Sequence, residues 1–148
     1  PTIVDGSVYV GTSQYSSHFY SLDAATGTEE WRFTDASGSI WVSAAVTSET
    51  AYIPCDDNSL YAVNLADGAL EWSFETDDSL RSAPIAVGET IYVGSTDENL
   101  YAIDQSGTEQ WRFQTEGKAG SPVYADGTLF VGSGYDDTTG ALYALTEA

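Results

Sequence analysis

The first residues that suggest chemistry are three acidic pairs that stand between apolar segments: Asp56-Asp57, Asp97-Glu98 and Asp136-Asp137. Carboxylate oxygens are the ligands that Ca²⁺ prefers in proteins, so Asp57, Asp97 and Asp137 are candidates for metal binding. The chain contains no Asp-x-Asp-x-Asp-Gly loop, however, and tight turns select Asp and Asn for their own geometry. We therefore expect turns at these places and no dedicated metal site.

The chain has few residues that could act as a catalytic nucleophile or bind zinc. His18 is the only histidine and Cys55 the only cysteine. A Ser-His-Asp triad would have to use His18, and no nucleophile-elbow motif accompanies it. A single cysteine forms neither an internal disulfide nor a thiolate metal cluster. We expect no catalytic residue, and ordinary structural roles for both side chains.

The charge of the chain excludes several kinds of partner. It has 23 acidic residues against 4 basic ones over 148 residues, a formal net charge of −19. Nucleic acids and anionic membranes are normally bound by Lys and Arg, so we expect neither as a partner. No apolar run reaches the roughly 18–20 residues of a membrane helix, which predicts no membrane insertion.

The acidic residues are spread evenly along the chain. This spread favours adaptation to high salt, where the repulsion between like charges is screened. A cation-binding surface is the alternative.

The elements that position these residues follow from a repeat with a period near 40 residues, which is typical of propellers and solenoids. Four series of residues mark it: Trp31, Trp72 and Trp111; Tyr20, Tyr61, Tyr101 and Tyr143; Tyr9, Tyr52, Tyr92 and Phe130; and Pro1, Ala44, Pro84 and Pro122. We divide a single domain, 1–148, into repeats 1–43, 44–83, 84–121 and 122–148.

Each repeat has a two-residue pattern and no helical one. Short segments such as IYVGST, LYAID and QWRF are rich in β-branched and aromatic residues, and pairs such as Asp67-Gly68 separate them. Four short antiparallel strands in about 40 residues make one propeller blade. The sequence therefore predicts an all-β chain, a β-propeller of four-stranded antiparallel blades.

The segment LDAATGTEEWRF resembles the repeat of the quinoprotein (PQQ-like) β-propellers, a family with a tryptophan-docking motif of the form A-x-D-x-x-T-G-x-x-x-W. The second copy here has Asn in place of Asp, and the third is one residue shorter between Asp and Gly. The resemblance implies that the Pro-headed strand lies by the central axis, that the Trp strand is outermost, and that each Trp packs structurally between adjacent blades. The motif residues are Asp23, Gly27 and Trp31; Asn64, Gly68 and Trp72; and Asp104, Gly107 and Trp111.

The same resemblance implies an incomplete ring. The chain supplies three full blades and the first three strands of a fourth, about three and three-quarter blades, whereas the family usually closes seven or eight. We expect either a fragment or mature product of a longer chain, or a homodimer that completes an eight-bladed ring. A closed four-bladed ring is the least favoured arrangement, because it would strain wedges shaped for a larger circle.

Two functions of different classes follow from the resemblance. A quinone-dependent dehydrogenase would hold PQQ and calcium in the axial channel, yet only four basic residues are available to receive the tricarboxylate. The favoured function is a non-catalytic scaffold or protein-binding module from a salt-adapted source, with a protein partner and no cofactor. The family's habits place it outside the cytoplasm or at the cell surface.

Partner contacts are expected where the repeats disagree near the channel. Trp41, Arg81 and Ala119 share one register position, eleven residues before Tyr52, Tyr92 and Phe130. Trp41 is the only Trp outside the docking motif, and Arg81 and Lys118 are two of the four cations. We take Trp41, Arg81 and Lys118 as candidate contacts for a ligand or partner. Local packing and a surface ion pair are the alternative.

Overall fold

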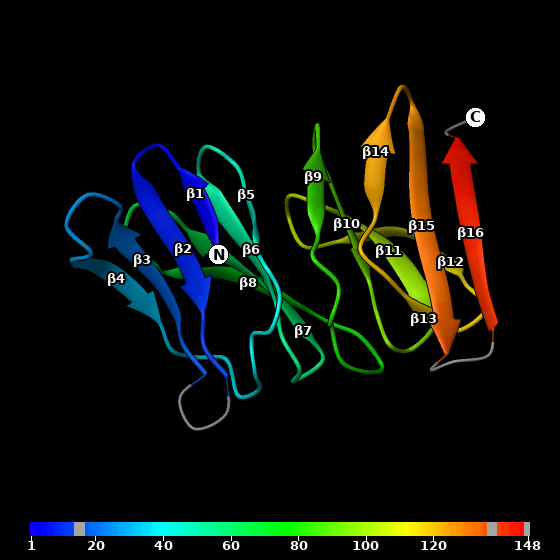
Figure 1. The fold of residues 1–148 in the computed structure, drawn as a ribbon, viewed down its shortest axis with the longest axis horizontal. Helices are drawn as coiled ribbons and strands as arrows, with labels where there is room; N and C mark the ends of the chain where they lie inside the picture. The colour runs from blue at the N-terminus through cyan, green and yellow to red at the C-terminus, as the bar shows by residue number, and fades with distance from the viewer. Residues whose placement is uncertain (14–16, 136–138, 147–148) are drawn as a thin grey trace.

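The computed structural model describes residues 1–13, 17–135 and 139–146, and every regular element in these ranges is a β-strand. The strands form four sheets of four, and the paired strands are antiparallel throughout. The sheets follow one another along the chain as blades of a propeller (Figure 1). The all-β propeller prediction is confirmed. No helix long and apolar enough to cross a membrane occurs in the described ranges.

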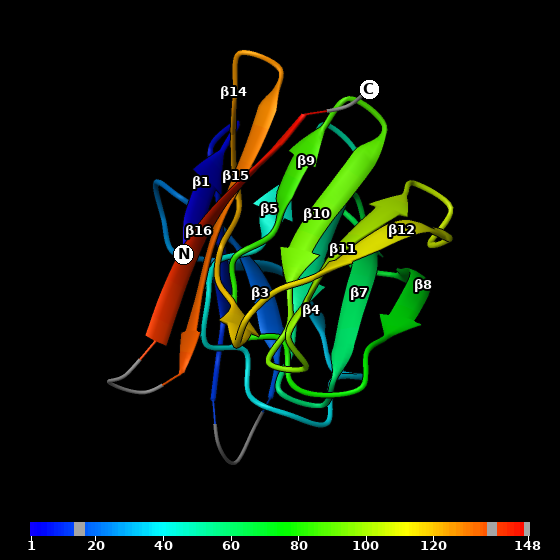
Figure 2. The same ribbon diagram turned by 90° about the vertical axis from the view of Figure 1, so that its right-hand side faces the viewer.

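The first three blades are built alike, each from four strands in chain order from the inside outward. Figure 2 shows this order in the third blade, which runs from β9 to β12 across the view. The strands are β1 (Thr2–Val4), β2 (Ser7–Gly11), β3 (Phe19–Asp23) and β4 (Glu29–Phe33); β5 (Ala45–Val46), β6 (Thr50–Pro54), β7 (Ser59–Asn64) and β8 (Leu70–Glu75); and β9 (Ile85–Val87), β10 (Thr90–Gly94), β11 (Asn99–Asp104) and β12 (Glu109–Gln114).

The turn before each outer strand explains the Asp and Gly of the repeat. Asp104 Oδ1 accepts hydrogen bonds from the backbone N–H groups of Ser106 at 2.9 Å and Thr108 at 3.0 Å. Gly107 has φ +83°, a left-handed conformation that glycine adopts without steric cost. A register shift in the pairing of β11 with β12 follows between Ala102 and Ile103.

Apolar side chains of adjacent blades meet in seams, because both faces of a middle blade are covered. In the second blade, Ile53 and Val63 pack toward the first blade, while Leu60 and Ala62 pack toward the third. All four side chains are buried. The short near-continuous apolar runs of the sequence thus arise from strands that are buried on two sides.

The outer Trp of each of the first two blades lies in a seam. Trp31 Nε1 donates to the backbone oxygen of Leu65 in the second blade at 2.7 Å, and Trp72 Nε1 donates to that of Gln105 in the third at 2.8 Å. A Cβ placed on Gly68 would lie 2.7 Å from the Trp31 ring. Glycine at this position therefore lets the indole lie directly on the neighbouring turn. A ring with an apolar face and one N–H donor suits such a seam.

The fourth blade differs from the sequence-based prediction in one respect. It contains the expected β14 (Val123–Ala125), β15 (Thr128–Tyr135) and β16 (Thr139–Thr146), and an additional two-residue strand, β13 (Lys118–Ala119), pairs with β15. β16 pairs with β15 along its whole length, so β13 and β14 share the opposite edge of β15. The fourth strand of this sheet is therefore an inner one, where the other blades have an outer one.

The four blades form an open arc, with the first and last blades at its two ends (Figure 1). The first and fourth blades each have one sheet face with no neighbouring blade, and these faces carry exposed apolar side chains. Ile3 is 71% exposed on the first blade, and Leu142 is 78% exposed on the fourth. The ring is not closed.

Candidate functional site

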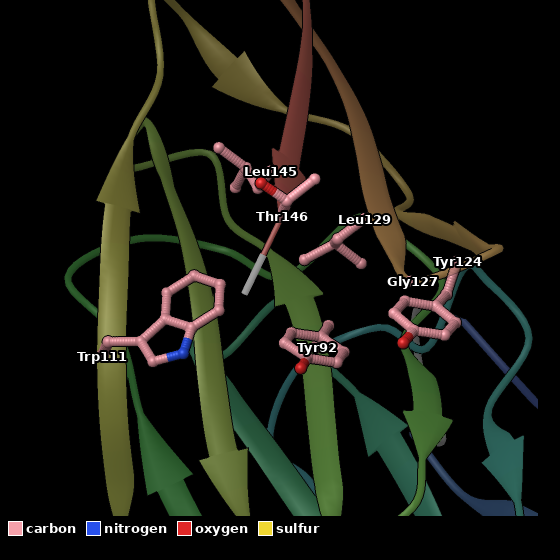
Figure 3. Close-up of a pocket in the computed structure, with 7 residues that line it drawn as sticks. All are labelled: Tyr92, Trp111, Tyr124, Gly127, Leu129, Leu145 and Thr146. Carbon is pink, nitrogen blue, oxygen red and sulfur yellow. The ribbon is translucent and has the colours of Figure 1, made fainter. Parts of the chain in front are cut away.

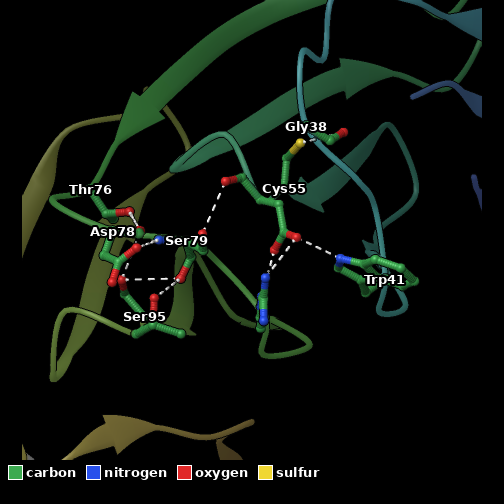
Figure 4. A network of polar contacts seen from close by, with 10 residues as sticks. Gly38, Trp41, Cys55, Thr76, Asp78, Ser79 and Ser95 are labelled. Atoms are coloured by element: carbon green, nitrogen blue, oxygen red, sulfur yellow. Dashed lines mark hydrogen bonds and ion pairs between the residues drawn. The ribbon is translucent and has the colours of Figure 1, made fainter. Parts of the chain in front are cut away.

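A cluster of Trp41, Asp56 and Arg81 lies on the loops that enter, cross and leave the second blade. Trp41 stands in the connection from β4 to β5, Asp56 in the turn between β6 and β7, and Arg81 in the connection from β8 to β9. Trp41 Nε1 donates to Asp56 Oδ2 at 2.6 Å (Figure 4). Arg81 donates to the same carboxylate with Nε at 2.8 Å and Nη2 at 3.1 Å. One carboxylate thus orients both side chains.

The backbone that carries this cluster repeats from blade to blade, while its side chains do not. The Asp56 N–H donates to the Ser39 oxygen at 3.0 Å, and the Thr96 N–H donates to the Ser79 oxygen at the same distance one blade later. Ser79 Oγ also donates to the Asp56 oxygen at 3.0 Å (Figure 4). The loops are therefore held rigidly, and Asp56 stands where the next blade has a neutral Thr96.

The cluster is half open to solvent. Trp41 is 54% exposed, and the Arg81 side chain is 61% exposed, whereas that of Asp56 is only 17% exposed. The Asp56 carboxylate raises the pKa of Arg81 by its hydrogen bond and its charge. A groove of about 360 Å³ adjoins the Trp41 ring and is lined by residues of three blades, among them Val10, Ile40 and Ala83. The surface thus offers an oriented aromatic face beside an apolar hollow.

Lys118 is not part of the Trp41–Asp56–Arg81 cluster, although we grouped it with Trp41 and Arg81 from the sequence. It is exposed in β13, and its charge acts on Asp78, as does that of Arg81. The Ser79 N–H, which donates to Asp78 Oδ1 at 2.7 Å, is the main reason that the pKa of Asp78 is lowered. Asp56 therefore joins two of the three predicted contacts, Trp41 and Arg81. From the sequence we named Asp56 only as part of a turn pair and did not connect it with either side chain.

Asp57 and Asp97, the metal candidates, use their oxygens inside the protein. Asp57 Oδ2 accepts from the Ser37 N–H at 2.7 Å and from the Tyr61 hydroxyl at 2.8 Å. Asp97 Oδ2 accepts from the Tyr101 hydroxyl at 2.7 Å and from the Asp77 N–H at 3.1 Å. Each carboxylate therefore ties a turn of one blade to the loop that leaves the preceding blade. In residues 1–13, 17–135 and 139–146 no group of three His, Cys, Asp or Glu side chains could hold a metal, and Asp137 lies outside the described residues.

His18 and Cys55 make local contacts. His18 Nδ1 lies 3.0 Å from the Tyr20 hydroxyl. Cys55 is fully buried, and its thiol donates to the Gly38 oxygen at 3.1 Å. Burial raises the pKa of the Cys55 thiol to about 12. Both side chains are accounted for by these local contacts.

A second hollow lies beside Trp111, lined by residues of the third and fourth blades (Figure 3). It has a volume of about 150 Å³ and is mostly apolar, with Tyr92, Leu129 and Leu145 facing the Trp111 ring. Trp111 is the third Trp of the repeat, so this hollow is the counterpart of the places where Trp31 and Trp72 meet the next blade's turn.

The architecture, the repeat and the seam tryptophans define the class of the protein. The chain belongs to the PQQ-like β-propeller repeat family, since a family model described as outer membrane protein assembly factor BamB matches residues 20–148. The resemblance seen in the motif is confirmed.

Two curated relatives resemble the chain. BamB of Bordetella pertussis is 29% identical over 106 residues, covering 70% of this chain and 28% of that protein. Tetrathionate hydrolase of Acidithiobacillus ferrooxidans is 22% identical over 144 residues, covering 79% of this chain and 28% of that protein. The chain thus spans little more than a quarter of the length of each.

Solved structures share the fold at low identity. BamB from Moraxella catarrhalis superposes with a TM-score of 0.73 at 20% identity, covering 85% of this chain and 39% of that chain. A europium-containing methanol dehydrogenase gives 0.68 at 20% identity, covering 78% and 24%. The computationally designed Ika4 protein gives 0.80 at 12% identity, covering 95% and 86%. Both a dehydrogenase and proteins that are not named as enzymes therefore share this fold, so the function must be argued from the site.

Proposed function

We propose that the chain is a non-catalytic propeller module that binds a protein partner through the Trp41–Asp56–Arg81 cluster. The observation that carries this proposal is the half-exposed Trp41 ring, whose N–H is held by the half-buried Asp56 carboxylate that also binds the Arg81 guanidinium. Trp and Arg are the residues most enriched at the energetic centres of protein interfaces, and preorganisation lowers the entropy lost on binding. Loops on a rigid ring are common places for such contacts.

The alternative, a fragment of a quinone-dependent dehydrogenase, fits the residues less well. PQQ is a tricarboxylate and needs cations. Arg32, Arg81 and Arg112 are each within 2.8 Å of a carboxylate of this chain, and two of these pairs lie on outer strands. The described ranges also offer no group of three acidic, His or Cys side chains for calcium. We derive no step through a quinone.

Site-specific photo-crosslinking tests the proposed contact. A photoreactive phenylalanine analogue would replace Trp41 in one variant and Leu70 in another, since Leu70 is 42% exposed on the outer strand β8. In cells of the source organism, we expect one discrete protein adduct from position 41 and none from position 70. Equal adducts from the two positions, or none from position 41, would contradict the proposal.

We also infer a salt-adapted source and a location outside the cytoplasm. The inference on salt is supported by the net charge of −19, because like charges destabilise a compact state until salt screens them. The inference on location is supported by membership of a family whose model is named for outer membrane assembly. A melting temperature that does not rise between low salt and molar KCl would contradict the first.

We further propose that a second copy covers the two ends of the arc. The end face of the fourth blade carries exposed Val123, Phe130 and Leu142, and that of the first blade carries exposed Ile3 beside Val8. These positions correspond to residues that pack in the internal seams, such as Leu100 and Tyr92, so the two faces could join head to tail in the same way. Two arcs of four blades joined in this way make a ring of eight.

A further inference from the structure

We propose that the face of the Trp41 ring binds a basic side chain, an arginine or a lysine, of the protein partner. This proposal rests on the function proposed above and adds the chemical class of the group that is recognised. A cation placed over an indole is attracted by the negative charge density on the ring face, and Trp attracts a cation more strongly than Tyr or Phe.

The Trp41 ring itself is the first observation. In the described part of the chain, Trp31, Trp72 and Trp111 each pack against another aromatic ring, whereas Trp41 packs against none. Trp41 is 54% exposed, and its N–H donates to Asp56 Oδ2 (Figure 4). This hydrogen bond lies at the edge of the indole, so it does not occupy the ring face that a cation needs.

The chain's own arginines are the second observation. In the first and third blades an arginine of the outer strand lies over a tyrosine ring of the neighbouring strand: Arg32 over Tyr20 at 5.7 Å, and Arg112 over Tyr101 at 5.0 Å. Among the residues that the structure describes, no such contact joins Arg81 to Trp41, because the Arg81 guanidinium is turned to Asp56 instead. The Trp41 face therefore lies beside an internal cation without being covered by it.

The charge around the ring favours a basic group over an acidic one. The surface is formed by the connections 34–44 and 76–84 and by the turn 55–58. These three segments contain five carboxylates and one cation: Asp35, Asp56, Asp57, Asp77 and Asp78, and Arg81. Since Arg81 is paired with one of the five, the surface keeps a negative charge. A basic side chain is attracted to such a surface and an acidic one is repelled.

The loop that carries Trp41 is fixed before a partner arrives. The Ser37 N–H donates to Asp57 Oδ2 at 2.7 Å, and the Cys55 thiol donates to the Gly38 oxygen at 3.1 Å. Both contacts tie the connection 34–44 to the turn of the second blade. A ring held in this way loses little conformational freedom when it binds a cation, which favours affinity.

Short peptides of matched shape and different charge test the proposal. The acetylated and amidated peptide Gly-Arg-Gly-Arg-Gly would be added to the ¹⁵N-labelled 148-residue chain in molar KCl, where charges are screened within about 3 Å. We expect a saturable NMR shift of the Trp41 indole N–H, with the other three indole resonances unchanged. Peptides with citrulline, a neutral analogue of similar shape, or with leucine in place of arginine should bind at least about tenfold more weakly.

Matched variants of the protein locate the contact. Trp41→Leu keeps an apolar side chain but removes the ring, so it should weaken binding of the arginine peptide at least about tenfold, followed through the peptide's own resonances. Tyr124→Leu removes another exposed ring, 40% exposed on β14, and should leave binding unchanged. Equal circular dichroism and melting temperatures would show that both variants are folded.

The outcomes separate this proposal from the proposed function on which it rests. Equal binding of the arginine, citrulline and leucine peptides, or binding that survives Trp41→Leu, would overturn the assignment of a basic group. A protein adduct from position 41 without a shift by the arginine peptide would overturn that assignment alone and leave the partner site in place. The absence of both the adduct and the shift would overturn both.

Discussion

At the scale of single residues, Cys55 and Ser95 occupy the same place in successive blades and perform the same task. Both are fully buried at the end of a middle strand, and both donate to a backbone oxygen of the loop that leaves the preceding blade. The position needs a small buried donor, and a thiol and a hydroxyl both supply one. The cysteine is therefore explained by packing and hydrogen bonding, without redox chemistry.

This role predicts an unreactive thiol. Because burial raises the pKa of the Cys55 thiol to about 12, the reactive thiolate is a minor species at pH 8. Ellman's reagent at pH 8 should label the folded protein far more slowly than the protein in concentrated urea. Cys55→Ser should change the free energy of unfolding by no more than about 1 kcal/mol. Rapid labelling of the folded chain would show that the loop above Cys55 opens.

Asp57 gives a prediction about acid. Partial burial alone would raise the pKa of Asp57, but the hydrogen bonds from Ser37 and Tyr61 outweigh it and lower the pKa below its ordinary value. Because the folded pKa is the lower one, the stabilisation from Asp57 is complete above about pH 4 and is lost as the pH falls through the folded value.

Asp57→Asn should accordingly lower the free energy of unfolding at pH 7 by about 1–3 kcal/mol and flatten its loss in acid. Urea unfolding between pH 3 and pH 7 measures both effects. Asp35→Asn, at an exposed carboxylate, is the control. An unchanged acid dependence in the Asp57 variant would show that the hydrogen bonds from Ser37 and Tyr61 to Asp57 do not stabilise the fold.

At the scale of elements, the seam glycines offer an internal comparison. Gly27 and Gly68 hold the same place in successive turns, with φ +71° and +74°. A Cβ on Gly27 would meet no atom within 4 Å, whereas one on Gly68 would lie 2.7 Å from the Trp31 ring. Gly27→Ala should cost about 1 kcal/mol for the backbone alone. Gly68→Ala should cost about 1–3 kcal/mol more, because the indole must move. Equal losses in urea unfolding would show that the seam is loose.

The elements were also the level at which the sequence was most informative. The period near 40 residues and the positions of Trp31, Trp72 and Trp111 predicted the blades, because every blade must satisfy the same packing. The inner strand β13 was missed, since a two-residue strand leaves no periodic pattern. The sequence predicted only part of the Trp41–Asp56–Arg81 cluster. Trp41 and Arg81 stood out because the other repeats have different residues there, but Asp56 resembled an ordinary turn residue. Only the fold shows that the Asp56 carboxylate accepts hydrogen bonds from both side chains.

At the scale of the whole molecule, the open arc and the charge act together. Molar salt screens the repulsion between two chains of net charge −19, so it should favour the proposed pairing of the end faces. Light scattering in molar KCl should give a mass near twice 15.8 kDa, and lower salt should shift the chain toward the monomer. Ile3→Asp should abolish the dimer, since it places a charge in the joined face. A monomer at every salt concentration would contradict the pairing.

Matched arginine variants in affinity capture test whether the Trp41–Asp56–Arg81 cluster binds a protein partner. Arg81 and Arg32 are both half exposed and both paired with a carboxylate, but Arg32 lies on an outer strand. Wild-type protein and Arg32→Ser should retain the same partner from an extract of the source organism, while Trp41→Ser and Arg81→Ser should lose it at unchanged melting temperature. Retention of that partner by Trp41→Ser and Arg81→Ser would show that the cluster is not the contact site.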